Sequence, residues 1–471
     1  MNFKMLKSAF FSICFFVCLT GFPQSYSLQV LIKNQPDKKI ILGSLRGDRF
    51  TPIDTTEGEV FQRGRLSYTK AEFQLAGSGY PGMYRVILGQ TLYAQVMNEP
   101  PQQFDFIFNH EDIAIETDFN HAGDSIAVVK SEENKAWFTF KNKERLHTQR
   151  LNQLMQFIND PQNSEEEIQE KRGEYNIAML EREEFINRSI RENRNLFAAK
   201  IMPMYHEPLL DAYLSEKERI EAYKNEYFNN LDFSDPALIN TTYYTDKVIH
   251  YIQVYGKYGL TRQQQENEFV KAVDVVLANV SKNPQVYELV LDYIVRGFER
   301  LGLDNALAYI AENYSGSTCG ADEKTTLERR LGAQKMVPGS IVPDFTMNDL
   351  NGDPVMLSQV LKEKTLILFW ASWCPHCCLM IPELKKWLAG IDTNSFEVVA
   401  VSLDTSKQEW QNKVFDLSIE SWFNLSDLKE WDGETAVAYN IYATPTMFLI
   451  DEGMKILGKP LTLKELKTVA D

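Results

Sequence analysis

The chain has 471 residues, of which 44% are hydrophobic and 24% are charged, the ordinary balance of a folded protein. Acidic residues outnumber basic ones by 65 to 49, which gives a formal net charge of −16. Because binding to a phosphate backbone requires a basic surface, this charge argues against nucleic acid as the main partner. At roughly 100–200 residues per domain, the length predicts about two to four domains.

The first 27 residues have the pattern of a secretory signal peptide. Lys4 and Lys7 precede an apolar stretch at 9–19, and small residues follow near position 27. The stretch is shorter than the roughly 20 residues that cross a bilayer. A lipid anchor through Cys18, with membrane association, is the alternative, but the bulky Val17 before it departs from a lipoprotein signal. We therefore expect a periplasmic protein, in a compartment where disulfides persist.

Residues 28–130 are expected to form an all-β, sandwich-like domain. Hydrophobic and polar residues alternate at 28–32, 104–108 and 113–116, as in strands with one buried face. Glycine and proline separate these runs, with the clearest turn at 77–82. The pattern is typical of a small antiparallel sandwich or meander.

Residues 131–331 are expected to form a helical domain. Ser131 is followed by two acidic residues, and Ser164 with Glu167 fits a capping box. Asn283 before a proline is a further helix start. Residues 332–343 are rich in Gly, Pro and Ser and indicate a linker, which leaves 344–471 as a third, α/β domain.

A Cys-x-x-Cys motif follows the apolar run at 365–370, which is typical of a central strand. Strand, tight turn, Cys374-Pro375-His376-Cys377 and helix are the arrangement that dithiol chemistry requires. The free amide groups and dipole at a helix start stabilise a thiolate on the first cysteine, and a protonated His376 adds to this. Pro375 suits a first helical turn. We expect Cys374 to be the exposed nucleophile and Cys377 to resolve the mixed disulfide.

A metal site is not expected. A zinc site of this class needs a second pair of ligands, whereas Cys319 stands alone. His206 beside Glu207 is also too small a set of ligands. Cys378 is expected to be a small buried core residue, and Cys319 to be a free or surface thiol.

Residues 335–471 resemble the thioredoxin superfamily, in particular its exported TlpA/ResA-like thiol–disulfide oxidoreductases. The similarity lies in four segments: Trp370–Cys377 with Pro382 after it, 342–345, 396–404 and 443–446. The resemblance implies a thioredoxin fold in which a cis Pro445 packs against the two sulfurs. It also implies that Thr444 presents its backbone to the substrate and that Trp373 shields the site.

The same resemblance extends to multidomain proteins in which a β-domain and a helical region of unsettled function precede the redox domain. It implies protein disulfides as substrates, an upstream membrane electron donor, and no cofactor beyond the Cys374–Cys377 disulfide. Two positions depart from family patterns, because acids found in some members are replaced here by Leu368 and Met380. The proton acceptor for Cys377 stays open.

Three alternatives remain at this point. The Pro-His pair between the cysteines resembles DsbA-like oxidases and isomerases, although the short interval to Pro445 leaves no room for their inserted helical domain. A peroxiredoxin is disfavoured because Ala371 replaces the expected Thr. In the third alternative, residues 28–330 bind a partner and the redox domain is secondary.

Overall fold

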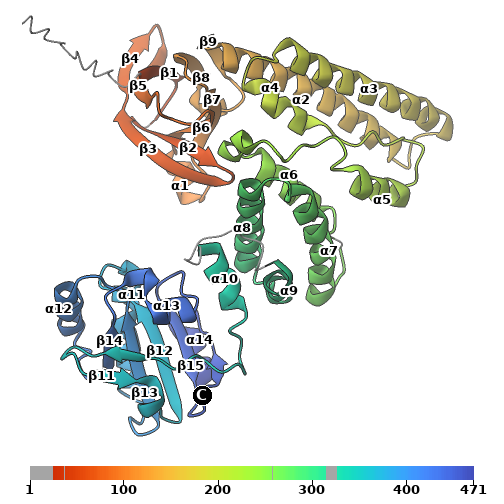
Figure 1. Ribbon diagram of the computed structural model, residues 1–471. Helices are drawn as coiled ribbons and strands as arrows, with labels where there is room; N and C mark the ends of the chain where they lie inside the picture. Colours follow the sequence, from red (N-terminus) through yellow and green to blue (C-terminus); the bar gives the residue numbers. More distant parts are fainter. Residues whose placement is uncertain (1–24, 37, 257, 315–325, 471) are drawn as a thin grey trace, which may run out of the picture. The chain divides into compact units, whose positions relative to one another are not determined.

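The computed structural model describes residues 25–36, 38–256, 258–314 and 326–470 (Figure 1). The expected signal peptide, Cys18 and Cys319 lie outside the described residues. The chain divides into two compact units, one of residues up to 232 with 237–244, the other of 233–236 with residues from 245 onward. The expected domain boundaries stay predictions.

The strands of the first unit form two sheets (Figure 1). One sheet has the strand order β4-β5-β1-β8-β9 and the other β3-β2-β6-β7. The elements are β1 (Ser25–Lys33), β2 (Lys39–Arg46), β3 (Arg49–Glu57), β4 (Glu59–Arg63), β5 (Leu66–Ala76), β6 (Gly82–Gly89), α1 (Leu92–Val96), β7 (Gln102–Phe108), β8 (Ile113–Asp118), η1 (Phe119–His121) and β9 (Ala127–Lys130).

The two sheets share one hydrophobic core, which confirms the sandwich-like all-β domain. Leu28, Val30 and Ile32 of β1 are fully buried, as their alternation predicts. Phe106 and Phe108 of β7 are fully buried in the same core.

The pairing of β1 with β8 differs from the expected antiparallel arrangement. Leu28 lies opposite Ile113, and the two strands run parallel. A parallel pair cannot be joined by a tight hairpin and needs a long connection. Here that connection includes all the intervening strands, so no local pattern in the sequence marks the pairing.

Two helices of the first unit, α2 and α3, begin where the sequence places their caps. Ser131 accepts a hydrogen bond from the N–H of Asn134, and Ser164 forms a full capping box with Glu167. The elements are α2 (Glu132–Ile158), α3 (Glu165–Glu192), α4 (Ala198–Ile201), η2 (Met202–Tyr205) and α5 (Glu216–Glu226). η3 (Pro236–Asn240) and α6 (Tyr243–Gln253) span the boundary between the units.

The second unit starts with helices and ends with an α/β domain, which confirms the expected order of fold classes. Its helices are α7 (Arg262–Val280), α8 (Pro284–Leu301), α9 (Asp304–Tyr314) and α10 (Thr326–Gln334). Asn283 caps α8 by accepting hydrogen bonds from two backbone N–H groups. α10 extends into the expected linker, because its last turn includes residues 332–334.

The C-terminal sheet has the order β11-β10-β14-β13-β12-β15-β16. Its elements are β10 (Thr346–Asn348), β11 (Pro354–Met356), η4 (Leu357–Gln359), β12 (Lys364–Trp370), α11 (Pro375–Leu388), β13 (Phe396–Ser402), α12 (Lys407–Leu417), β14 (Phe423–Ser426), η5 (Glu430–Asp432), α13 (Glu434–Ala438), β15 (Thr446–Ile450), β16 (Ile456–Gly458) and α14 (Leu463–Ala470). β12, β13 and β14 are parallel, and β15 is antiparallel to β12.

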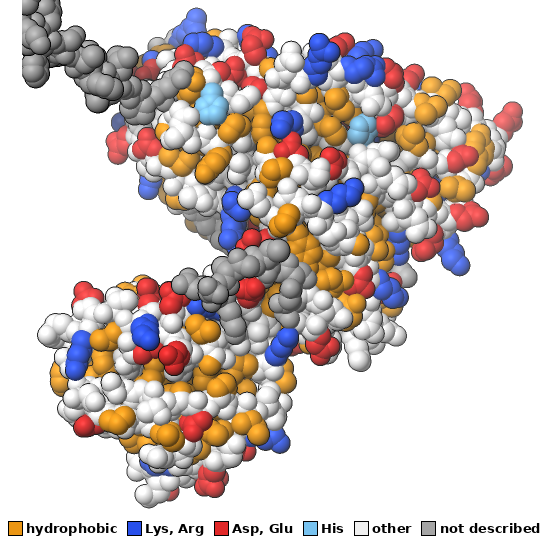
Figure 2. Space-filling view, viewed as in Figure 1, with side chains coloured by type: hydrophobic (Ala, Val, Ile, Leu, Met, Phe, Trp, Pro, Cys, Tyr) orange, Lys and Arg blue, Asp and Glu red, His pale blue; other side chains and the backbone are white. Residues whose placement is uncertain are grey.

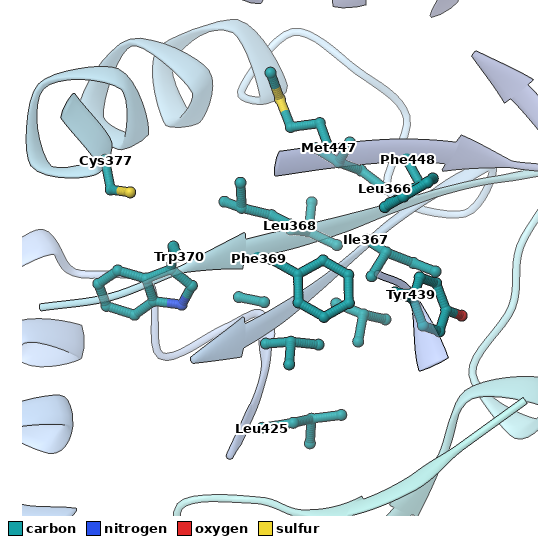
Figure 3. Packing of buried hydrophobic residues seen from close by; sticks show 14 of the residues in the cluster. Leu366, Ile367, Leu368, Phe369, Trp370, Cys377, Leu425, Tyr439, Met447 and Phe448 are labelled. Carbon is teal, nitrogen blue, oxygen red and sulfur yellow. The ribbon is translucent and has the colours of Figure 1, made fainter. Parts of the chain in front are cut away.

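β12 is the central strand of this sheet and is buried on both faces. Residues 365–370 are all fully buried, which fits a strand covered on both sides. Successive side chains point to opposite faces, so that Leu368 lies on the side of α11 and Phe369 packs with Tyr439 on the other (Figure 3). This packing fixes the end of β12, from which the cysteine motif emerges.

Charged side chains of both signs are spread between hydrophobic ones over the face shown in Figure 2. In the part of the chain that the structure describes, no helix combines the length and apolar character needed to cross a bilayer.

Candidate active site

The two motif cysteines are joined by a disulfide at the start of α11. Their Cα atoms are 5.3 Å apart, with Cys374 at the N-cap and Cys377 one turn into the helix. The backbone N–H of Cys377 donates a hydrogen bond to Sγ of Cys374 over 3.1 Å. Pro375 occupies the first helical position, where no N–H is required. A negative charge on this sulfur would therefore meet an oriented backbone donor and the positive end of the helix dipole.

A cis-proline loop covers the first cysteine. The Thr444–Pro445 peptide bond is cis, and the carbonyl oxygen of Thr444 lies 3.6 Å from Sγ of Cys374. Sheet register explains this meeting, because Phe369 near the end of β12 lies opposite Thr446 at the start of β15. The residues after β12 and those before β15 are thus brought to the same edge.

Cys374 is less exposed than expected. Only 3% of its surface is accessible, against 0% for Cys377, so in the oxidised protein both are buried. The nearby Thr444 backbone accounts for part of this cover. The prediction of an exposed nucleophile is therefore wrong for the disulfide form.

The other predicted site residues surround the disulfide with different exposures. Trp373 is 47% exposed, and its ring centroid lies 6.0 Å from that of Trp431. Pro375 and His376 are exposed, whereas Thr444 and Pro445 are half-buried. An exposed aromatic side chain thus stands next to the motif cysteines.

A buried carboxylate that the sequence analysis did not single out holds the turn before Cys374. Asp404, directly after β13, is 1% exposed. Its two oxygens lie 3.2 and 3.0 Å from the backbone N–H of Ser372, and Oγ of Ser372 donates over 2.5 Å. Oγ of Ser402 donates a further bond over 2.6 Å. The signal available in the sequence was an Asp at the carboxyl end of an apolar strand.

Cys378 is half-buried and free, rather than a fully buried core residue. Its Sγ lies 3.6 Å from the carbonyl oxygen of Ser372, on the turn and not on the disulfide. The helix geometry explains the difference, because the position after Cys377 turns away from the core.

The positions of the missing family acids are apolar. Leu368 is fully buried, and Met380 is partly buried against the core. Glu383 is exposed, and its carboxylate accepts a hydrogen bond from Lys386 over 2.7 Å, which lowers the pKa of Glu383. Its side chain is therefore engaged at the helix surface.

A cavity of about 750 Å³ lies elsewhere in the same domain, along β10, the end of β14 and α13. Its lining includes none of the predicted site residues. Tyr439 at its wall donates a hydrogen bond to the carbonyl oxygen of Pro343, and burial raises the pKa of Tyr439 far above its usual range. The disulfide is thus separate from this cavity.

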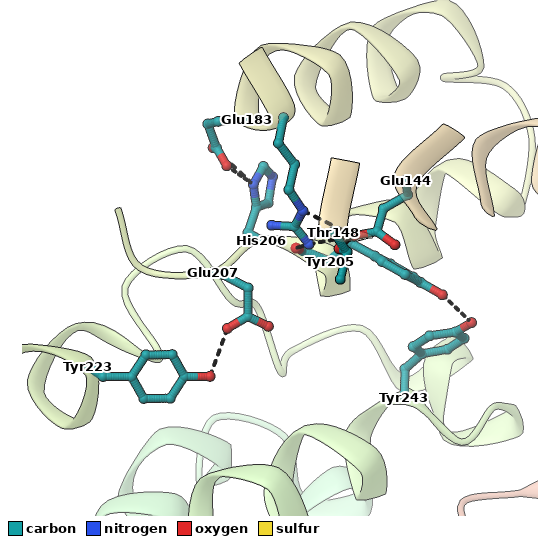
Figure 4. Close-up of polar contacts among 9 residues, drawn as sticks. Glu144, Thr148, Glu183, Tyr205, His206, Glu207, Tyr223 and Tyr243 are labelled. Atoms are coloured by element: carbon teal, nitrogen blue, oxygen red, sulfur yellow. Dashed lines mark hydrogen bonds and ion pairs between the residues drawn. The ribbon is translucent and has the colours of Figure 1, made fainter. Parts of the chain in front are cut away.

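His206 and Glu207 are adjacent in the sequence but have different polar partners. His206 Nδ1 lies 2.9 Å from Glu183, whereas Glu207 accepts a hydrogen bond from Tyr223 (Figure 4). A neighbouring buried pair joins Arg182 to Glu144 over 2.7 Å. Among the described residues, no group of three or more His, Cys, Asp or Glu side chains is arranged to hold a metal.

Comparisons with known proteins match the C-terminal region. Residues 338–458 match the model of the AhpC/TSA family. Thioredoxin-like protein YneN of Bacillus subtilis (strain 168) is 30% identical over 131 residues, which cover 27% of this chain and 72% of YneN. Thiol-disulfide oxidoreductase ResA of the same strain is 26% identical over 126 residues, covering 27% of this chain and 68% of ResA.

Solved structures match the same region. A thiol-disulfide oxidoreductase from Bacteroides fragilis NCTC 9343 is 26% identical, with a TM-score of 0.26. The match covers 27% of this chain and 96% of the solved one.

Proposed function

Because the chain belongs to the ResA/TlpA-like thiol–disulfide oxidoreductases of the thioredoxin superfamily, we propose that it reduces disulfide bonds of periplasmic proteins through Cys374 and Cys377. The observation that carries the proposal is the position of Cys374 at the start of α11, where the N–H of Cys377 donates to its sulfur. The signal-like N-terminal sequence supports the periplasmic location.

The reaction proceeds by two thiol–disulfide exchanges. In the reduced protein, the thiolate of Cys374 attacks one sulfur of the substrate disulfide and displaces the other as a thiolate. The helix start favours the attacking thiolate. Cys377 then attacks Sγ of Cys374, which releases the second substrate thiolate and forms the Cys374–Cys377 disulfide. Two electrons pass to the substrate, and an upstream membrane dithiol donor restores the enzyme.

The surface beside the disulfide holds the substrate in this proposal. Thr444 presents its backbone next to Cys374, and Pro445 fixes the direction of that backbone. The exposed face of Trp373 provides apolar contact, and Pro375 with His376 borders the same surface. The proposed substrates are polypeptides, and backbone and aromatic contacts can bind them with little dependence on their sequence.

Insulin reduction with dithiothreitol as electron donor tests the proposal. Replacing Cys374→Ser is expected to lower the rate to that of dithiothreitol alone, because no nucleophile remains. Cys378→Ser is the matched control, since Cys378 is the next cysteine in the chain and lies outside the disulfide. Activity that survives Cys374→Ser, or that disappears in Cys378→Ser, would contradict the assignment.

Oxidation of substrates is the second candidate, and the Pro375-His376 pair supports it. The two directions differ in reduction potential, about −120 mV for a DsbA-type oxidant and about −270 mV for thioredoxin. Equilibration of the Cys374–Cys377 pair with glutathione of known potential therefore separates them. We expect a value near that of thioredoxin, and a value near −120 mV, about 150 mV higher, would favour the oxidase.

A further inference from the structure

Helix α10, from the helical part of the second unit, contacts two loops of the redox domain through one buried arginine. Arg329 is 5% exposed. Its guanidinium donates hydrogen bonds to the carbonyl oxygen of Trp431 and, over 3.4 Å, to that of Ile441. It also lies 3.1 Å from a carboxylate oxygen of Asp432. One side chain thus joins three acceptors on two separate segments.

Both segments lead to residues that flank the disulfide. Trp431 in η5 has its ring 6.0 Å from that of Trp373, the exposed aromatic residue of the motif. Ile441 lies four positions before Pro445, on the stretch that leads into the cis-proline loop. Arg329 therefore holds two sides of the surface on which the proposed substrate rests. Its hydrogen bonds and ion pair go to these segments and not to Cys374 or Cys377.

A second layer of contacts keeps α10 against the same stretch. Arg330 lies over the ring of Tyr442 at 4.9 Å and pairs with Glu299 of α8 over 3.0 Å. Tyr442 also donates a hydrogen bond to Glu299 over 3.3 Å. Burial raises the pKa of Glu299 and raises that of Tyr442 to about 12. This layer ties both α8 and α10 to the residue next to Ile441.

The backbone of α10 also approaches the redox domain closely. A Cβ added at Gly332 would overlap the side chain of Asn440. Nζ of Lys459 donates to the carbonyl oxygen of Ala333 over 2.8 Å, and burial lowers the pKa of Lys459 to about 8. The contacts extend along the helix and are not limited to one side chain.

Arginine is suited to this position for a geometric reason. Its planar guanidinium presents five N–H donors in fixed directions, so it can serve two carbonyl groups and a carboxylate at once. Lysine has a single nitrogen and cannot reproduce the fork. Removing the guanidinium would leave the carbonyl oxygens of Trp431 and Ile441 without this donor, and the two segments would lose their common anchor.

We propose that Arg329 is a positioning residue for substrate binding, which sets Trp431 and the cis-proline loop at the spacing that a protein disulfide requires. The inference rests on the proposed reductase function and adds a role for the helical region. Arg329 acts on docking of a polypeptide and leaves the exchange chemistry of Cys374 unchanged.

Steady-state kinetics of the full-length chain test this role. Arg329→Gln is expected to raise the KM for insulin about tenfold, equal to about 1.4 kcal/mol, with kcat within about twofold. The rate with the small disulfide 5,5′-dithiobis(2-nitrobenzoate), which needs no polypeptide docking, should also stay within about twofold. Arg329→Lys should give an intermediate KM, since it keeps the charge but has its N–H donors on a single nitrogen. Arg300→Gln, on the exposed side of α8, is the control.

A double-mutant cycle with Trp431→Phe distinguishes positioning from general damage. If Arg329 acts through Trp431, the two changes in KM are not additive, because both disturb the same side of the substrate surface. Additive effects, an unchanged KM in Arg329→Gln, or equal losses with insulin and the small disulfide would overturn the inference. Failure of the proposed function looks different, because the unmodified chain would then not reduce insulin at all. If Arg329→Gln does not fold, the KM of Arg329→Lys decides, and a value equal to that of Arg300→Gln refutes the role.

Discussion

Replacing Asp404 with alanine is expected to destabilise the turn that carries Cys374. The carboxylate of Asp404 is buried and joins the end of β13 to Ser372, two positions before the cysteine. Three donors point at it: the N–H and Oγ of Ser372 and the Oγ of Ser402. Alanine removes both carboxylate oxygens, so these three donors lose their acceptor.

The size of the effect follows from these donors. The hydroxyl groups can rotate toward other acceptors, whereas the N–H of Ser372 is fixed by the backbone. One buried donor without a partner costs about 1–3 kcal/mol, and the lost bonds to a charged group add to this. We expect Asp404→Ala to lower the free energy of unfolding by about 2–4 kcal/mol. For a unit of this size, the melting temperature falls by roughly 4–16 °C.

Calorimetry of the full-length chain measures this change, with insulin reduction as the functional readout. The looser turn should also lower the rate of insulin reduction. Asp416→Ala is the control, because the Asp416 side chain is 70% exposed and its ion pair with Lys413 spans 3.9 Å. This variant should change the free energy of unfolding by no more than about 0.5 kcal/mol. If Asp404→Ala melts at the temperature of Asp416→Ala, the carboxylate does not hold the turn and the reasoning is refuted.

Two further predictions concern stability. Gly297→Ala in α8 should raise the free energy of unfolding by about 0.5–1 kcal/mol, because a Cβ there meets open space. Gly332→Ala in α10 should not gain this stability, because its Cβ would overlap the side chain of Asn440. Thermal melts of the two variants measure the difference. Hydrogen bonding to Lys130 lowers the pKa of Asp112 from 3.8 to about 2, so its stabilising effect is full above pH 3.8 and is lost as the pH falls through about 2. Acid unfolding of Asp112→Asn should show a weaker pH dependence over that range, and an unchanged profile would contradict this.

Features that rest on neighbours in the sequence could be predicted. Ser164 and Glu167 lie three positions apart and form the capping box that their spacing predicts. Cys374 and Cys377 are likewise close in the chain, and the N-cap position follows from the strand and proline beside them. The burial of Leu28, Val30 and Ile32 in β1 could also be predicted, because side chains along a strand alternate between the two faces of the sheet.

Features that depend on distant segments could not be predicted. The parallel pairing of β1 with β8 joins residues 85 positions apart at Leu28 and Ile113. Arg329 reaches carbonyl groups more than 100 positions away, and a carbonyl group carries no sequence signature. The contact of Asp404 with Ser372 joins residues 32 positions apart, and the sequence around Asp404 does not indicate it. The thioredoxin resemblance placed Pro445 near the disulfide, and the register of β15 on β12 explains how.

Trapping the mixed disulfide tests most directly whether Cys374 is the attacking nucleophile. The full-length Cys377→Ser variant, reduced and then mixed with insulin, cannot resolve the intermediate, so the substrate should stay bound to the attacking sulfur. Mass spectrometry of a digest prepared without reductant identifies that sulfur. We expect an insulin chain linked to Cys374. A link to Cys378 instead, or no covalent complex with any cysteine, would contradict this assignment.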